Sequence, residues 1–290
     1  MDTARIVVGV DGSPASTAAV RWAAAEAWLR EADLEVLMAY QSTAPRLRFG
    51  TSATFQRAAD ERAAAIVDDA VSEAKSITPH TPLRGSAVIG YPAQVLLKAA
   101  HGADLVVVGS RGRGGFGGLL LGSVSAQVAT HASCSVVVVR GRANTAIGPV
   151  VVGVDASPSA EAALGLAFAE AALRRHATLE AVTAYPPPVP LWTGGPPPPP
   201  YDPDQVDDLL RRELDRQLLD WRNKYPDVTV EAHVVSGGAA GVLVERSHRA
   251  QLVVVGARSR GGFDGLLLGS VGLHLLHHAD CPVLIARTAG

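Results

Sequence analysis

Short runs of valine, isoleucine and leucine alternate along this chain with longer alanine-rich stretches whose apolar residues recur at helical spacing. Continuous apolar runs of this kind are typical of parallel strands that helices cover on both faces. In the first half, strands are predicted at 6–10, 34–40, 83–89, 105–108 and 136–139. Helices are predicted at 14–30, within 53–76, at 92–100 and at 124–131. This order of elements indicates an α/β fold.

The second half of the chain repeats the first. The stretch 105–124, LVVVGSRGRGGFGGLLLGSV, returns 147 residues later as LVVVGARSRGGFDGLLLGSV, with 17 of 20 positions identical. The segment RIVVGVDGSPAS at 5–16 returns as PVVVGVDASPSA at 149–160. In both copies the Ser-Pro pair predicts a helix N-cap followed by the first helical residue. The sequence therefore predicts two tandem domains, at 1–143 and 147–290, each of small-domain size.

The topology follows from the rule that strand–helix–strand crossovers are right-handed. It predicts one doubly wound, parallel, five-stranded sheet per domain, with strand order 3-2-1-4-5 and helices on both faces. The last strands, at 135–140 and 282–287, would leave apolar edges uncovered in a single domain. The two halves are therefore expected to pack through these strands as an intramolecular pseudo-dimer.

Two suggestive elements converge at the point where the strand order switches, between the first and fourth strands. Asp11 and Asp155 follow the first strands, and glycine-rich, arginine-bearing loops follow the fourth strands and end at a Gly-Ser pair. Ligands of open α/β sheets bind at this point. Backbone N–H groups of such a loop and of the helix that it opens attract phosphate, and glycine lets the backbone approach closely. The sequence therefore predicts a phosphate-binding site in each half.

The spacing Gly109-x2-Gly112-x9-Gly122-Ser123 after a strand, combined with the Val-Gly-Val-Asp of the N-terminal strand, resembles the ATP-binding universal stress proteins. The resemblance covers nearly all of both halves, as in the tandem-domain, actinobacterial type of that family. It implies ATP as the ligand, with adenine near the ends of the first two strands and the triphosphate on the glycine loop. It also implies that Asp11 and Asp155 lie close to the ribose or to an ATP-bound Mg²⁺ ion.

Carried over by position, the resemblance implies two sets of ATP-binding residues. The first set is Gly9, Val10, Asp11, Ala39, Gly109, Arg111, Gly112, Gly122, Ser123, Val124 and Ser125. The second set is Gly153, Val154, Asp155, Ala184, Gly256, Arg258, Gly269, Ser270 and Val271. The second half departs from the pattern at two places, since Ser259 replaces Gly112 and Gly272 replaces Ser125. If the glycine position requires a left-handed backbone, the serine costs about 1–2 kcal/mol and weakens the second site.

Two other phosphate motifs match only in form. The segment 112–117 fits the dinucleotide fingerprint G-x-G-x-x-G, but it follows the fourth strand instead of the first, and its copy at 259–264 lacks the first and last glycines. The segment 117–123 resembles a P-loop, but serine follows Gly122 directly and no lysine is present to reach the phosphates. Neither motif changes the prediction.

Composition narrows the class of protein. A net charge of −2 with 19% charged residues suggests neither a nucleic acid nor an acidic membrane surface as a partner. No apolar run approaches the roughly 18 residues of a membrane span, and the chain enters a strand without a hydrophobic leader. A cytoplasmic protein is therefore expected. The chain's two cysteines, Cys134 and Cys281, are repeat equivalents and are expected to be small buried residues without a disulfide.

Two further features of the second half have a plain and a functional interpretation. His274, His277, His278 and Cys281 offer metal-ligating atoms, but they end the last helix, where histidine offsets the helix dipole, and this structural interpretation is preferred. The stretch 186–203 contains ten prolines and predicts an extended, exposed excursion. Docking of a partner on that excursion is the alternative to a variable surface loop.

No Ser/His/Asp set, Cys/His set or pair of carboxylates for catalysis can be assembled from these loops. The expected function is therefore that of an ATP-binding stress-response protein, a nucleotide-dependent signalling module with an unidentified protein partner. Whether the chain also forms a homodimer stays open. Two alternatives stay open. One is a weak Mg²⁺-dependent ATPase, and the other is a nucleotide-free dimerisation scaffold.

Overall fold

The computed structural model describes residues 3–41, 53–113, 120–143, 147–174, 177–186, 202–258 and 267–287. In the first half the elements are β1 (Arg5–Val10), α1 (Pro14–Arg30), β2 (Asp33–Tyr40), α2 (Ala53–Ile77), β3 (Leu83–Ile89), α3 (Pro92–Ala100), β4 (Leu105–Gly109), α4 (Ser123–His131) and β5 (Ser135–Val139). In the second half they are β6 (Val150–Gly153), α5 (Pro158–Leu173), β7 (Leu179–Tyr185), α6 (Pro203–Lys224), β8 (Val230–Ser236), α7 (Ala239–Ser247), β9 (Leu252–Gly256), α8 (Ser270–His278) and β10 (Val283–Ala286). Every element predicted for the first half is present.

The strands form one continuous sheet in the order β3-β2-β1-β4-β5-β10-β9-β6-β7-β8. Within each half the strands are parallel and follow the predicted order 3-2-1-4-5. At the centre, β5 and β10 pair antiparallel, with Val137 opposite Leu284. The predicted packing of the halves through their last strands is therefore confirmed, and it joins the two five-stranded sheets into one.

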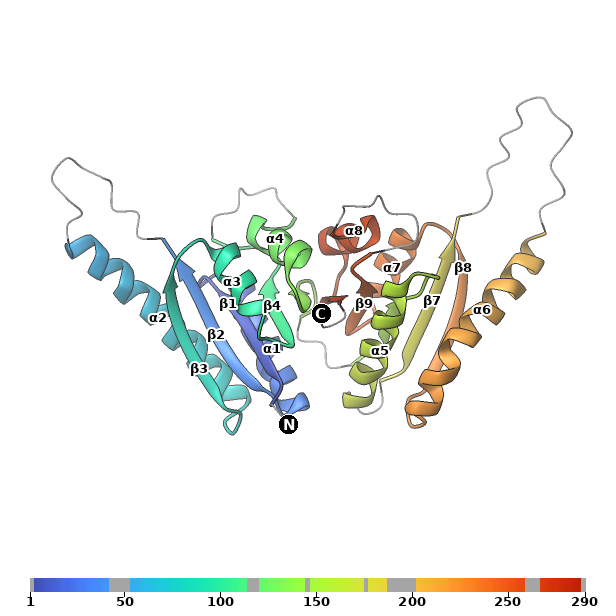
Figure 1. Ribbon diagram of the computed structural model, residues 1–290, viewed down its shortest axis with the longest axis horizontal. Helices are drawn as coiled ribbons and strands as arrows, with labels where there is room; N and C mark the ends of the chain where they lie inside the picture. Colours follow the sequence, from blue (N-terminus) through green and yellow to red (C-terminus); the bar gives the residue numbers. More distant parts are fainter. Residues whose placement is uncertain are drawn as a thin grey trace, which may run out of the picture.

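Helices cover both faces of this sheet (Figure 1). One core lies under α1, α2, α5 and α6, and the other lies under α3, α4, α7 and α8. Both first helices start as predicted, because the Ser13 hydroxyl accepts the N–H of Ser16 and the Ser157 hydroxyl accepts that of Ala160. None of the helices in the described part of the chain is both long enough and apolar enough to cross a membrane.

A buried group of four charged side chains joins α1 to α5. Glu26 and Arg30 of α1 are the repeat equivalents of Glu170 and Arg174 of α5. Glu170 is fully buried and Glu26 is 1% exposed. Each arginine pairs with both glutamates. We refer to these four residues as the charge quartet.

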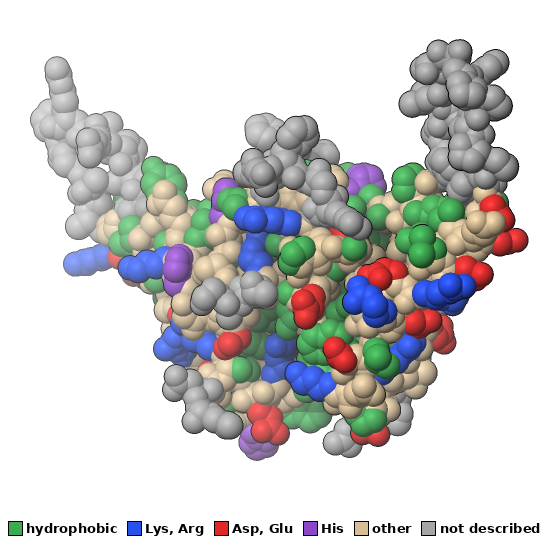
Figure 2. All heavy atoms as spheres, turned by 45° about the vertical axis from the view of Figure 1, so that its right-hand side comes forward, with side chains coloured by type: hydrophobic (Ala, Val, Ile, Leu, Met, Phe, Trp, Pro, Cys, Tyr) green, Lys and Arg blue, Asp and Glu red, His purple; other side chains and the backbone are tan. Residues whose placement is uncertain are grey.

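The outer surface mixes charges of both signs. On the face shown in Figure 2, lysine and arginine side chains alternate with aspartate and glutamate side chains across both halves. This arrangement agrees with the small net charge of −2.

Candidate functional site

Asp11 joins the turn after β1 to the loop after β4. These strands are parallel neighbours, with Val8 opposite Val107, so both end at the same edge of the sheet. The Asp11 carboxylate accepts the backbone N–H of Ser13 at Oδ1 (3.0 Å) and that of Arg113 at Oδ2 (2.7 Å). The structure therefore brings together the two elements that the sequence placed at the switch point, and Asp11 also caps backbone groups there.

The same edge forms in the second half. β6 and β9 are parallel neighbours, with Val152 opposite Val254. Asp155 follows β6 and accepts the backbone N–H of Ser157 at Oδ1 over 3.0 Å, and it also accepts the hydroxyl of Ser157. Asp155 therefore caps the turn after β6 through Ser157, as Asp11 caps the turn after β1 through Ser13.

Each glycine-rich loop closes on itself through one backbone hydrogen bond. The N–H of Gly122 donates to the oxygen of Ser110 over 2.7 Å, and the N–H of Gly269 donates to the oxygen of Ala257 over 2.8 Å. The start of each loop is therefore placed beside the first turn of the helix that ends it. The segments 114–119 and 259–266 between these points lie outside the described residues.

The helices that end the two loops begin without a side-chain cap. Gly122 is the N-cap of α4 and Gly269 is the N-cap of α8, and neither has a side chain that could accept a first-turn N–H. The first N–H groups of a helix lack intrahelical partners and form the positive end of the helix dipole. Both helix starts are therefore suited to accept an anion.

Packing around the strand ends accounts for Gly109 and Gly256 and contributes at Gly9 and Gly153. A Cβ at Gly109 would lie 2.6 Å from the oxygen of Ala15, and a Cβ at Gly256 would lie 2.6 Å from that of Ser159. A Cβ at Gly9 would lie 2.9 Å from the end of the Leu96 side chain in α3, and a Cβ at Gly153 would lie 2.8 Å from that of Leu243 in α7, so these leucines would have to shift. These glycines let the helices lie close to the strand ends, whatever ligand the site takes.

The strain that was expected at Gly112 is absent. The described glycines with a positive φ are Gly12, Gly141, Gly148 and Gly237, so Gly112 is not left-handed. A Cβ at Gly112 would instead lie 2.6 Å from Oδ2 of Asp11. The left-handed backbone on which the expected cost depended is therefore absent at Gly112, and a side chain there would instead displace the Asp11 carboxylate. Ser259, its counterpart, lies outside the described residues.

The Ser125 side chain points into the protein interior. Its side chain is buried, and its hydroxyl donates to the backbone oxygen of Gly109 over 2.6 Å. The hydroxyl therefore ties α4 to the end of β4. Gly272 replaces it in the second half, where a Cβ would lie 3.0 Å from Leu268.

The second half contains a pocket at this edge. Seven of its lining residues belong to the predicted second set, namely Gly153, Val154, Asp155, Ala184, Gly256, Arg258 and Val271. The other lining residues are Ala160, Val182, Ala239, Leu243 and Val255. Gly269 and Ser270 complete the predicted set at the start of α8. The structure thus gathers widely separated residues around one mostly apolar hollow that Asp155 and Arg258 also line.

The predicted residues of the first half lie at the equivalent edge. Gly9 and Ala39 are half-buried, Val10 is buried with its side chain in the core, and Arg111 is exposed. Ser123 is exposed at the start of α4, and Val124 is half-buried behind it.

Sequence reasoning missed two kinds of residue at these sites. Ala239 and Leu243 of α7 line the second pocket, and the apolar spacing of that helix was the signal available. Arg140 and Arg287 follow the last strands and reach across to α8 and α4. No local pattern marks them, because their partners belong to the opposite half.

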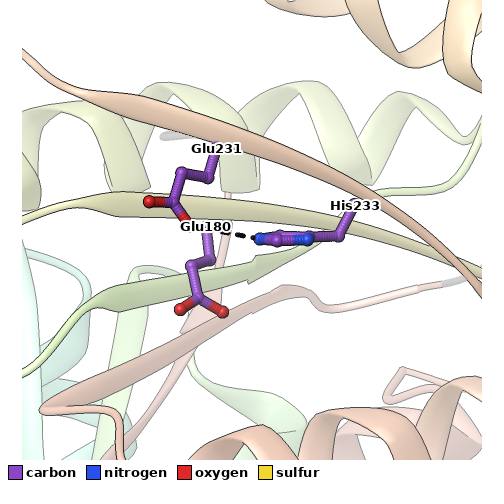
Figure 3. Close-up of side chains that lie close together, drawn as sticks. All are labelled: Glu180, Glu231 and His233. Atoms are coloured by element: carbon purple, nitrogen blue, oxygen red, sulfur yellow. Dashed lines mark ion pairs between the residues drawn. The ribbon is translucent and has the colours of Figure 1, made fainter.

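A group of possible metal ligands forms far from the predicted sites. Among the described residues, Glu180, Glu231 and His233 each bring one ligand atom within 4.8 Å of the others (Figure 3). Oε2 of Glu180 already accepts hydrogen bonds from Arg246 (2.6 Å) and Arg249 (2.8 Å). These two guanidinium groups neutralise the carboxylate that a cation would need.

The histidines at the end of α8 do not make a comparable group. The rings of His274 and His278 lie with their centroids 4.4 Å apart. In the described part of the chain, however, no three of His274, His277, His278 and Cys281 bring their ligand atoms close enough together to hold a metal ion. Burial, His278 and Arg140 lower the pKa of His277.

Both cysteines are buried and unpaired, as expected. Burial raises the pKa of the Cys134 thiol to about 11 and that of the Cys281 thiol to about 12. The thiols are therefore protonated and unreactive at neutral pH. The proline-rich segment 187–201 lies outside the described residues.

Comparison with known proteins agrees with this architecture. The model of the Universal stress protein family matches residues 3–140 and again 147–287. Universal stress proteins of Mycolicibacterium smegmatis and Mycobacterium tuberculosis are 38% and 37% identical to this chain over 303 and 291 residues, covering 97% of it and 96% of each relative. The crystal structure of a universal stress protein from Archaeoglobus fulgidus has the same fold, with a TM-score of 0.70 at 17% identity over 98% of this chain and 96% of that one. The repeated match over nearly all of both halves shows that this chain belongs to the universal stress protein family, as two tandem copies of its domain.

Proposed function

We propose that the protein binds ATP at the carboxyl edge of each half and acts as a nucleotide-dependent regulatory module. The observation that carries the proposal is the closure of each glycine-rich loop. The bonds from Gly122 to Ser110 and from Gly269 to Ala257 set an uncapped helix start beside the loop and its aspartate. A phosphate group at that place would meet several backbone N–H groups and the positive end of a helix dipole.

The second pocket offers complementary chemistry for the rest of the nucleotide. Val182, Ala184 and Leu243 provide an apolar wall of the kind that accommodates a planar base. Arg258, at the start of the loop, also lines the hollow and supplies a positive charge for phosphate. An adenine nucleotide therefore fits the distribution of apolar and charged groups in this hollow.

Asp11 and Asp155 are the residues that would hold Mg²⁺ with the nucleotide. Each Asp11 oxygen accepts one backbone N–H, and a carboxylate oxygen has a second lone pair that a hard cation can use. Bound Mg²⁺ would offset the charge of the phosphates. The aspartates would position it while continuing to cap the turn.

The test is the loss of binding in variants that add bulk and negative charge at the helix start. A Cβ at Gly122 would meet backbone atoms at 3.6 Å, which is an ordinary contact, so Gly122→Glu should fold. Gly122→Glu should remove the first site and Gly269→Glu the second, measured by titration calorimetry with Mg·ATP. Gln127→Glu, an exposed position on the same helix α4, is the charge-matched control and should bind normally.

Two further measurements decide between this function and its alternatives. Mass spectrometry of the purified protein identifies any retained nucleotide, and a protein that neither retains nor binds one would be a nucleotide-free scaffold. Steady-state turnover with and without Mg²⁺ separates a binding protein from a weak ATPase. Unchanged ATP affinity in the folded double variant would overturn the assignment of the site.

A further inference from the structure

Arg140 and Arg287 occupy equivalent positions in the repeat, each directly after the last strand, and each reaches into the opposite half. Nη2 of Arg287 donates to the backbone oxygens of Ala129 (2.6 Å) and Thr130 (2.9 Å) in the last turn of α4. Nη1 of Arg140 donates to the backbone oxygen of Leu275 in α8 over 2.9 Å. The contact is reciprocal, because each half holds a helix of the other.

These two helices are the ones that begin at the phosphate loops. α4 starts at Ser123 and α8 starts at Ser270, and each is nine residues long. The last carbonyls of a helix form the negative end of its dipole, so a guanidinium there is favoured. The Leu275 oxygen also accepts the N–H of Ala279 over 2.9 Å, so Arg140 is a second donor to it. A helix of this length spans about 13 Å. Its i→i−4 hydrogen bonds join the two ends, so we expect a shift at the C-terminus to move the N-terminus as well.

The backbone of each arginine is fixed beside the phosphate loop of its own half. The N–H of Ser110 donates to the oxygen of Val139 over 2.9 Å, which sets Arg140 beside the start of the first loop. The N–H of Ala257 donates to the oxygen of Ala286 over 3.1 Å, which sets Arg287 beside the start of the second. Each arginine therefore connects the base of one loop to the helix of the other.

Keeping these guanidinium groups inside the protein costs free energy. Nε of Arg140 and Nη1 of Arg287 are buried and have no hydrogen-bond partner among the described residues. Burial lowers the pKa of both side chains below the ordinary arginine value. An arginine at a strand end can extend into water, so two equivalent, half-buried arginines that each keep one buried N–H unpaired indicate that their contacts with the helices matter.

We propose that Arg287 positions the first nucleotide site and Arg140 positions the second, each from the opposite half. This inference rests on the proposed function. Loss of Arg287 removes two hydrogen bonds from the end of α4, so the N–H groups at Ser123 are no longer held at a fixed place relative to the loop. Loss of Arg140 removes one hydrogen bond near the end of α8 and should loosen that helix correspondingly.

The test uses the full chain in two backgrounds, Gly269→Glu with only the first site and Gly122→Glu with only the second. Methionine replaces the arginine because it is long and fills space but donates no hydrogen bond. Arg287→Met should weaken Mg·ATP binding about tenfold where only the first site remains, and less than about twofold where only the second remains. Arg140→Met should weaken binding about tenfold where only the second site remains, and less than about twofold where only the first remains. Titration calorimetry measures both.

Arg287→Lys keeps a positive charge beside the carbonyls and should recover part of the affinity. A general loss of stability would weaken both sites alike, so equal effects in the two backgrounds would overturn the proposal. An effect confined to the arginine's own half would overturn it as well. If the parent chain binds no ATP, the proposed function fails first, and the two failures are thereby distinguished.

Discussion

Arg174 of α5 donates a hydrogen bond from Nη2 to Oε2 of Glu26 in α1, over 2.5 Å and across the boundary between the two halves. Glu26 is 1% exposed, so this bond lies out of contact with water. Burial works to raise the pKa of Glu26, but Arg174 and Arg30 outweigh it and hold the pKa below its ordinary value. The carboxylate is therefore ionised, and its charge is balanced within the charge quartet.

Removal of one partner from the charge quartet should destabilise the protein strongly. Glu26→Ala leaves Arg30 and Arg174 buried with one carboxylate between them, and breaking a buried pair costs about 3–5 kcal/mol. Urea unfolding measures the loss. Asp215→Ala breaks the exposed pair with Arg222 and serves as the control, with an expected loss below about 1 kcal/mol. Similar losses in the two variants would contradict this account of the quartet.

The fold was predictable from sequence because the patterns that specify its strands and helices are local and occur twice along the chain. Apolar runs and alanine-rich stretches set the element order, and the apolar edge of β5 required a partner that β10 supplies. The roles of Arg140 and Ser125 were not predictable. Arg140 contacts a carbonyl 135 residues away, and the Ser125 hydroxyl bonds to Gly109 instead of facing outward. Side-chain direction at a loop depends on packing that no periodicity encodes.

Acid should destabilise the first half through Glu35. Burial works to raise the pKa of Glu35, but hydrogen bonds from Arg5 and Arg84 outweigh it and lower the pKa below its ordinary value of 4.5. A lowered folded-state pKa gives stability that is present above the unfolded value and is lost as pH falls through the folded value. Urea unfolding of the parent and of Glu35→Gln from pH 7 to about pH 3 should therefore converge at the acid end. Parallel profiles would show that Glu35 contributes nothing to the pH dependence.

Each half should associate when it is expressed alone. Val136, Val137 and Val138 of β5 are fully buried against β10, so residues 1–143 alone would expose an apolar strand edge. Such an edge pairs with another strand, giving a self-dimer or an aggregate. Analytical ultracentrifugation should show this, and mixing the two halves should yield a one-to-one complex. A stable monomer that ignores its complementary half would contradict the expectation.

ATP should stabilise the fold far more than adenosine does. With ligand at a thousandfold excess over its dissociation constant, binding adds about 4 kcal/mol. The uncapped starts of α4 and α8 favour the phosphates, which adenosine lacks. Thermal melting with Mg·ATP should therefore rise by several degrees, and with adenosine by much less. Equal shifts for the two ligands would show that the phosphates contribute little.

The first site should bind ATP more tightly than the second, because a side chain at Gly112 would have to displace the Asp11 carboxylate. A Cβ at Gly112 would lie 2.6 Å from Oδ2 of Asp11, the oxygen that accepts the N–H of Arg113. Gly112→Ser, which imitates Ser259 of the second half, should push the carboxylate aside. In the Gly269→Glu background it should lower ATP affinity about ten- to thirtyfold by calorimetry.

A double-mutant cycle identifies the cause of that loss. If the serine acts by displacing Asp11, then Gly112→Ser should cost little more in a chain that already carries Asp11→Ala, because the two changes remove the same interaction. Ser259→Gly should correspondingly strengthen the second site. If Gly112→Ser lowers ATP affinity as much in the Asp11→Ala chain as in the parent, the serine disturbs the loop directly. The contact with Asp11 is then not the cause of the loss.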